Sequence, residues 1–197
     1  MANTTMDAMT TRLIATLRGY GVNANTATEN VLWVNQTIEK LCAVYKILKD
    51  SFTYTTVAGT TAYQLNSVSP FPKFVTDVKF GSTDLVEADL AVVEADLAAG
   101  NTTVWRFAIY KDGANWWIKL NAAPGTSSVI VTGAYLPDYV AAGANELPLP
   151  VEYDNVVEAG AVGEAVKVYV YDINVKTMAN NNFNATLAEM GLKDGHS

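Results

Sequence analysis

Residues 147–153 read Leu-Pro-Leu-Pro-Val-Glu-Tyr, and this stretch decides the fold. Each proline disfavours the helical conformation of the residue before it, while Pro150 is suited to the first position of a helix. The stretch therefore predicts an extended segment that leads into a new helix. It follows a long block with β-strand patterns, and the chain before that block is again helical. The β block thus interrupts a helical protein.

Two amphipathic helices are predicted before the β block. Apolar residues recur at steps of three and four over residues 5–18, which is the spacing of one helix face. Thr26 and Glu29 form a capping-box pattern that opens a second helix, and its apolar stripe continues to about Lys49. Neither helix is able to bury its apolar stripe alone.

Helices are also predicted after residue 147. Residues 150–170 carry small and apolar side chains near one helix face, although the alternation over 166–171 fits a strand equally well. A weaker helix is predicted over 179–190. Packing the helices on both sides together is the simplest way to bury all of their stripes.

Between the helices the apolar period changes to two. Residues 52–57 and 60–65 predict a hairpin that turns at Ala58-Gly59. A third strand is predicted before a turn at 81–84, where a second hairpin begins. Further strands complete about six in all, and the strands after the first hairpin are 73–80, 104–110, 116–120 and 129–135.

The segment 85–99 breaks the strand pattern. It is rich in Ala and Leu with spaced acids, and it predicts one short surface helix. The hexapeptide Val-Glu-Ala-Asp-Leu-Ala occurs in it twice, at 86–91 and 93–98. Two copies are too few to indicate a coiled coil.

These patterns predict an α+β fold, a helical bundle with an inserted antiparallel β-sandwich or barrel-like subdomain. The helical body is expected to comprise 1–50 and 147–190, the β subdomain 51–146, and a flexible C-terminal tail 191–197.

Composition narrows the possible functions. Charged residues make up 17% of the chain, against roughly 25% in an average soluble domain, and surfaces poor in charge often contact other proteins. The net charge is −7 and the 13 Lys and Arg residues are scattered, which argues against a nucleic-acid-binding groove.

The N-terminus shows no signal-peptide pattern, and no stretch is apolar enough to span a membrane. Cys42 lies on an apolar helix pattern and predicts a buried, reduced thiol, which suits assembly in a reducing cytoplasm.

No catalytic, metal-binding or cofactor-binding constellation is found. His196 is the only histidine and lies in the terminal tail. No phosphate-binding glycine loop occurs, and Gly160-Ala-Val-Gly163 is interpreted as helix packing. The acids of the last helices are interpreted as exposed helix positions: Asp154, Glu158 and Glu164. The acids of the Ala-rich segment are interpreted as a solvated face: Glu87, Asp89, Glu94 and Asp96. The chain is therefore not expected to be an enzyme.

Aromatic and small residues are the candidates for an interface. Trp116 and Trp117 are neighbours in a strand, so they point to opposite faces and at most one belongs to the core. Aromatic residues are enriched at interfaces, and small residues let helices approach closely. The candidate interface residues are Trp105, Tyr110, Trp116, Trp117, Tyr153, Gly160 and Gly163.

The order of blocks resembles the head-to-tail adaptor proteins of tailed bacteriophages. The resemblance rests on 52–65, 120–124, 129–137 and 147–153, and it spans about residues 5–190. It implies a structural virion protein at the head–tail junction, assembled in the host cytoplasm as a ring of about a dozen copies. The ring would contact the portal protein and the tail nozzle or another neck protein, and DNA would pass through its channel during genome ejection. The acidic segment 87–99 matches no family motif.

Two other readings stay open at this point. A carbohydrate-binding β-sandwich module would use Trp105, Trp116 or Trp117 as a stacking platform. A cell-wall hydrolase carried by a virion would rest on Glu87 or Glu94.

Overall fold

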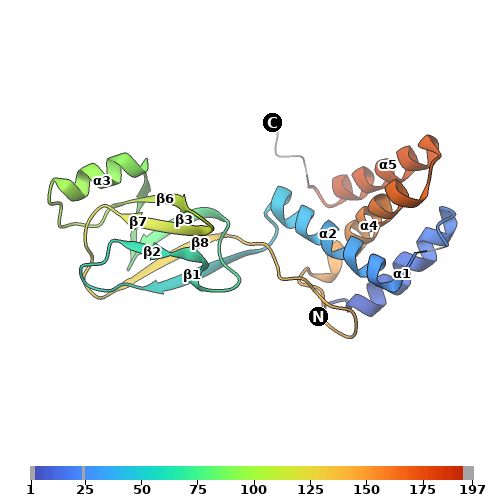
Figure 1. The fold of residues 1–197 in the computed structure, drawn as a ribbon, viewed down its shortest axis with the longest axis horizontal. Coiled ribbons are helices and arrows are strands. Elements are labelled where there is room, and N and C mark those ends of the chain that lie inside the picture. The colour runs from blue at the N-terminus through green and yellow to red at the C-terminus, as the bar shows by residue number, and fades with distance from the viewer. Residues whose placement is uncertain (1–2, 24, 193–197) are drawn as a thin grey trace. The chain divides into compact units, whose positions relative to one another are not determined.

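The computed structural model describes residues 3–23 and 25–192. Two compact units are present, one of Met1–Tyr45 with Pro137–Ser197 and one of Lys46–Leu136. The described residues form five α-helices and eight strands, which confirms the predicted α+β class (Figure 1). Of the predicted tail 191–197, residues 193–197 lie outside the described residues, and so does His196.

The first unit is a helical body built around α4. The unit contains α1 (Met6–Gly19), α2 (Ala27–Tyr45), the 3-10 turn η2 (Val151–Tyr153), α4 (Asp154–Tyr169) and α5 (Ile173–Glu189). Helix α4 contacts α1, α2 and α5 (Figure 1). Met6, Met9, Leu13 and Leu17 of α1 are fully buried, so the predicted stripe is the core face of that helix.

The start of α2 agrees with the sequence pattern, but its end does not. The capping box is present, because the Thr26 amide donates to Glu29 at 2.7 Å and the Glu29 amide donates to the Thr26 hydroxyl at 3.2 Å. The predicted extension to Lys49 is wrong, since α2 ends at Tyr45. Lys46 adopts a positive φ of 52°, which stops the helix, and Lys49 already pairs with Ala134 in a sheet.

The segment that precedes α4 lies against the helices. The Leu147 amide donates to the Thr4 carbonyl at 2.8 Å, and Leu147 and Leu149 are buried. Upstream, the Asn35 amide group exchanges two hydrogen bonds with the Val140 backbone, at 3.0 and 2.8 Å. Pro150 precedes the first helical turn rather than opening it.

The last two helices differ from the predicted ones, since α4 begins later than expected, at Asp154 after η2, and α5 is longer than expected. Helix α4 continues through Tyr169, so the alternative strand over 166–171 does not form. Helix α5 begins at Ile173, with Asp172 accepting from the Asn174 amide as its cap, and the prediction had its start at 179.

The second unit is a sandwich of two four-stranded sheets. One sheet has the order β1 (Lys49–Thr55), β8 (Ser128–Ala134), β3 (Phe74–Phe80) and β4 (Thr83–Asp84). The other has the order β2 (Ala62–Gln64), β7 (Asn115–Leu120), β6 (Arg106–Asp112) and β5 (Val86–Glu87), and the short 3-10 turn η1 (Leu65–Ser67) follows β2. Only the β5–β6 pair is parallel among the described strand pairs. Neither sheet closes into a barrel.

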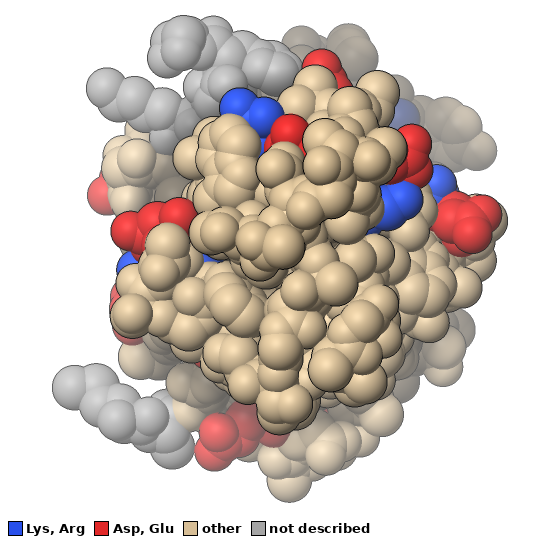
Figure 2. All heavy atoms as spheres, turned by 90° about the vertical axis from the view of Figure 1, so that its left-hand side faces the viewer, with Lys and Arg blue, Asp and Glu red and all other residues tan. Residues whose placement is uncertain are grey.

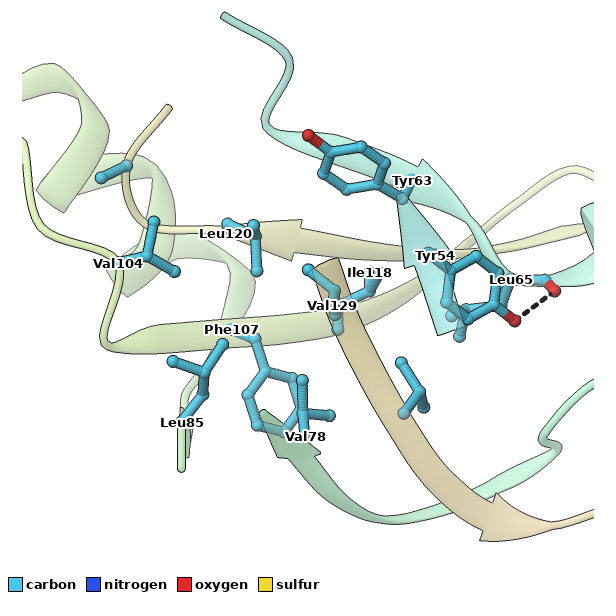
Figure 3. Close-up of a cluster of buried hydrophobic side chains, with 12 residues drawn as sticks. Tyr54, Tyr63, Leu65, Val78, Leu85, Val104, Phe107, Ile118, Leu120 and Val129 are labelled. Carbon is cyan, nitrogen blue, oxygen red and sulfur yellow. Dashed lines mark hydrogen bonds between the residues drawn. The ribbon is translucent and has the colours of Figure 1, made fainter. Parts of the chain in front are cut away.

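Apolar side chains from both sheets form the core of the sandwich. Figure 3 shows Val78 and Val129 of one sheet facing Phe107, Ile118 and Leu120 of the other. All five are at most 4% exposed. Strand alternation places these residues on the inner faces, as expected for a sandwich. Where the unit begins and ends, the Tyr135 amide donates to the Leu48 carbonyl at 3.0 Å.

The first predicted hairpin is wrong. Strands β1 and β2 do not pair with each other, because β1 pairs with β8 and β2 pairs with β7 in the opposite sheet. The turn after Val57 therefore carries the chain from one sheet to the other. Tyr54 of β1 links the sheets by donating its hydroxyl to the Leu65 carbonyl at 2.7 Å (Figure 3). The second predicted hairpin is present as β3 and β4.

The predicted single helix over 85–99 is only partly present. Val86 and Glu87 form β5, and helix α3 spans Leu90–Ala98. The second copy of the repeated hexapeptide is thus helical throughout, whereas the first copy begins as β5 and only its last two residues, Leu90 and Ala91, belong to α3. Edge hydrogen bonds hold the first copy, because the Val86 amide donates to the Trp105 carbonyl at 3.0 Å and the Ala88 amide donates to the Phe107 carbonyl at 2.9 Å.

Candidate interface surfaces

The neighbouring tryptophans of β7 lie on opposite faces of their sheet. Trp116 packs against the sandwich core. Trp117 pairs in register with Tyr110 on one side and Gln64 on the other, so these three residues share the outer face. The prediction that at most one tryptophan belongs to the core is confirmed.

The aromatic residues do not form one flat, exposed platform. Among the candidate rings Trp105, Tyr110, Trp116 and Trp117, only Trp105 is exposed. The Arg106 guanidinium covers the Trp105 ring at 3.6 Å from its centroid. Trp117 is half-buried, and its indole Nε1 is buried without a hydrogen-bond partner among the described residues. A sugar stacking over several rings therefore finds no continuous surface here.

Helix α3 lies on the outer face of the same sheet. Its Glu94 pairs with Lys119 of β7 at 2.7 Å, and its Asp96 pairs with Arg106 of β6 at 3.2 Å. Glu94 is therefore engaged in a structural ion pair. Figure 2 shows one face of the molecule on which uncharged residues predominate.

The small residues of α4 have two different surroundings. A Cβ built on Gly160 would lie 2.4 Å from Thr37 Cγ2 and 3.0 Å from Phe183 Cε2, so Gly160 serves the packing of α2 and α5 within the chain. A Cβ on Gly163 would meet nothing within 4 Å. Tyr153 is half-buried at the end of η2. These residues belong to the helical body, and the aromatic candidates belong to the other unit.

Asp154 is not an exposed helix position, and this prediction is wrong. The residue is 7% exposed, and it accepts hydrogen bonds from the Thr4 hydroxyl at 2.5 Å and from Arg12 at 3.1 Å. Arg12 also pairs with Glu158 at 2.7 Å. The guanidinium compensates both carboxylates, so that α1 is tied to the start of α4 by charge-assisted hydrogen bonds.

A second polar link joins α2 to the end of α4. The Tyr169 hydroxyl donates to Glu29 at 2.6 Å, and its ring meets Trp33 edge-on at 5.9 Å. This hydrogen bond is the main reason why the pKa of Glu29 is lowered, and bonds from Thr26 add to it. The same hydrogen bond raises the pKa of Tyr169.

A cavity that the sequence patterns did not indicate opens between α2, α4 and α5. Its volume is about 270 Å³, and Gly160 and Gly163 form part of its wall. Three lysines line it, and they are Lys40, Lys167 and Lys176. The lysines come from three helices, and no local spacing relates them. Only the knowledge that α2 and α5 flank α4 would have brought them together.

Among residues 3–23 and 25–192, no cluster of three or more His, Cys, Asp or Glu side chains is arranged to hold a metal ion. Cys42 is buried, as its helix pattern predicted. Within the same described ranges, no helix is long and apolar enough to cross a membrane.

Comparison with known families agrees with the block order seen in the sequence. The family model described as SU10 adaptor protein matches residues 4–197, which include both compact units. The chain belongs to the SU10 adaptor protein family. This is a family of phage head-to-tail adaptors, so the protein is a bacteriophage adaptor and a structural component of the virion. No curated protein matches the chain.

Membership in the SU10 adaptor family also bears on the candidate residues. Such adaptors are structural proteins and are generally not enzymes. We infer that the ion pairs of α1 with α4 and of α3 with its sheet stabilise the fold of the adaptor.

Proposed function

We propose that this chain is the subunit of a ring that joins the portal to the tail and leaves a channel for DNA. The observation that carries the proposal is the adaptor family match over residues 4–197. Rings of identical copies use complementary faces on each subunit, and about a dozen copies are expected by analogy with the family. Assembly is expected to take place in the host cytoplasm.

We further propose a division of labour between two domains. The helical body contacts the portal protein, and the β unit faces the tail nozzle or another neck protein. A core in each unit supports this division, because a unit with its own core keeps its shape when only one side is bound. Trp105, Tyr110 and Trp117 are proposed for the tail side, and Tyr153 and Gly163 for the helical side. Trp116 packs against the sandwich core and Gly160 against α2 and α5, so neither is available to a partner.

The acidic character of the chain supports a channel through which DNA slides. With a net charge of −7, the surface repels phosphates on average instead of holding them. A tight DNA complex at physiological salt would contradict this part of the proposal, and an electrophoretic mobility assay measures it directly.

The test of the ring is reconstitution with the portal protein of the same phage. Mass photometry of the chain alone and with portal is expected to show a multi-copy complex, and negative-stain images are expected to show a ring with a central opening. A chain that stays monomeric at every concentration and never joins the portal would overturn the proposal.

A further inference from the structure

The cavity between α2, α4 and α5 has a floor with an unusual polar atom. Thr37 is 2% exposed, and its hydroxyl oxygen is buried without a hydrogen-bond partner among the described residues. Thr37 lines the cavity beside Gly160. Buried hydroxyls are normally hydrogen-bonded, because an unpaired one costs free energy. The oxygen is shielded from the empty cavity, so a ligand group supplies the missing partner when the Thr37 side chain rotates its hydroxyl toward the cavity.

The cavity wall carries an excess of positive charge. Lys167 pairs with Glu164 at 2.7 Å, so these two charges compensate each other. Lys40 lies over the Phe183 ring at 5.4 Å. Among the described residues, no carboxylate lies within ion-pair distance of Lys40 or Lys176. The charged lining therefore has three lysines against one glutamate, in a chain that is strongly acidic.

The shape of the cavity admits a side chain from outside. Its rim is open, since Lys40, Lys167, Thr177 and Asn180 are exposed. Gly163 adds no Cβ that would narrow it. Phe183 provides an apolar wall next to the polar floor. A short acidic side chain fits this combination, because its carboxylate accepts hydrogen bonds from the lysine ammonium groups and the threonine hydroxyl while its methylene groups touch the ring.

We propose that this cavity receives a carboxylate side chain from a second copy of the chain. The inference deepens the proposed function and rests on it for the assembly of copies. The chain itself supplies the complementary charge, since it has 20 acidic residues against 13 Lys and Arg. A head-to-tail contact in a ring joins two different faces, so a basic hollow on one face is complemented by an acidic group on the other.

Charge reversal with a matched control tests the proposal. Lys40→Glu with Lys176→Glu reverses the two unpaired lysines of the cavity. Lys73→Glu with Lys111→Glu makes the same change in net charge at exposed lysines of the β unit, and these lysines also lie over aromatic rings. Sedimentation velocity, with and without portal, then measures the concentration at which copies associate.

The cavity pair is expected to raise the association concentration at least about tenfold, as for the loss of a hydrogen-bonded charge pair at an interface. The control pair is expected to change it less than about threefold, since rim charges matter less. Circular dichroism of both pairs checks that the helical content is retained. Association of the cavity pair at the wild-type concentration would overturn the inference. A cavity pair that forms rings normally but no longer binds portal would also overturn it, because the occupant would then be the portal.

Thr37→Val separates a ligand role from a structural role. The substitution keeps the shape and removes the unpaired hydroxyl, so the melting temperature is expected to rise while association of copies weakens. A higher melting temperature with unchanged association would show that the hydroxyl contacts no ligand, against the proposal. Failure of the wild-type chain to associate under any condition would instead count against the proposed ring itself.

Discussion

Two glycines one turn apart on α4 predict opposite effects of the same substitution. Gly160→Ala places a methyl group 2.4 Å from Thr37 Cγ2, which is a stiff, β-branched side chain with little room to move. We expect a loss of about 1–3 kcal/mol in the free energy of unfolding, as for other overpacked sites. Gly163→Ala meets no atom within 4 Å and is expected to stabilise α4 by up to about 1 kcal/mol. Urea denaturation of the two variants measures both, and equal effects would contradict the packing described here.

Tyr54 predicts a loss of stability at alkaline pH. The side chain is 7% exposed, and burial raises its pKa to about 12 from an ordinary value of 10.0. The folded state thus favours the neutral phenol. Its contribution is fully present below about pH 10 and is lost as the pH rises through about 12. Tyr54→Phe is expected to make the free energy of unfolding fall less steeply between pH 10 and 12, as measured by denaturation at each pH. An equally steep decline in the variant would assign the alkaline effect to another group.

At neutral pH, Tyr54→Phe is expected to lower the free energy of unfolding by about 1 kcal/mol, because the hydrogen bond to the Leu65 carbonyl is lost.

At the scale of elements, the repeated hexapeptide offers a comparison of one residue type in two environments. Val93 in α3 is fully buried, whereas Val86 in β5 is 59% exposed. Val93→Ala is expected to cost about 1–3 kcal/mol, because two buried methyl groups are lost and a small cavity remains. Val86→Ala is expected to cost less than about 0.5 kcal/mol. Thermal unfolding of both variants checks the difference, and a larger effect at Val86 would mean that the edge strand is covered.

The elements themselves were largely predictable from the sequence, and their partners were not. The stripe of α1 and the capping box of α2 are local patterns, and both were found. The pairing of β1 with β8 joins residues about eighty positions apart, and alternation in 52–65 carries no information on which strand lies beside which. The same limit explains the two structures of the repeated hexapeptide, since the first copy begins as a strand because β6 offers it an open edge.

The surroundings of the candidate interface residues were even less predictable than the strand partners, because they depend on residues far apart in the sequence. Gly160 was recognised as a packing residue, because small residues at helical spacing are a local signal. The neighbours that use it, Thr37 and Phe183, come from helices far away in sequence. The burial of Asp154 is not visible in local sequence for the same reason, since it depends on Thr4 and Arg12 at the other end of the chain.

At the scale of the whole molecule, two separate cores predict two units of independent stability. The fragment Lys46–Leu136 contains the whole core of the sandwich and both of its sheets. Expressed alone, it is expected to fold, with dispersed amide resonances and a cooperative thermal transition. The full-length chain gives the reference spectrum. A fragment with the narrow amide dispersion of an unfolded chain would mean that the sandwich needs the helical body.

The hydrogen bond between the Tyr135 amide and the Leu48 carbonyl has a consequence for the engineering of such adaptors. It brings the first and last residues of the sandwich side by side, so the two chain connections between the sandwich and the helical body start from adjacent points. Any foreign module with adjacent termini satisfies the same condition. We expect that replacing the sandwich by another module with adjacent termini, a reporter or an epitope for display leaves the helical body folded.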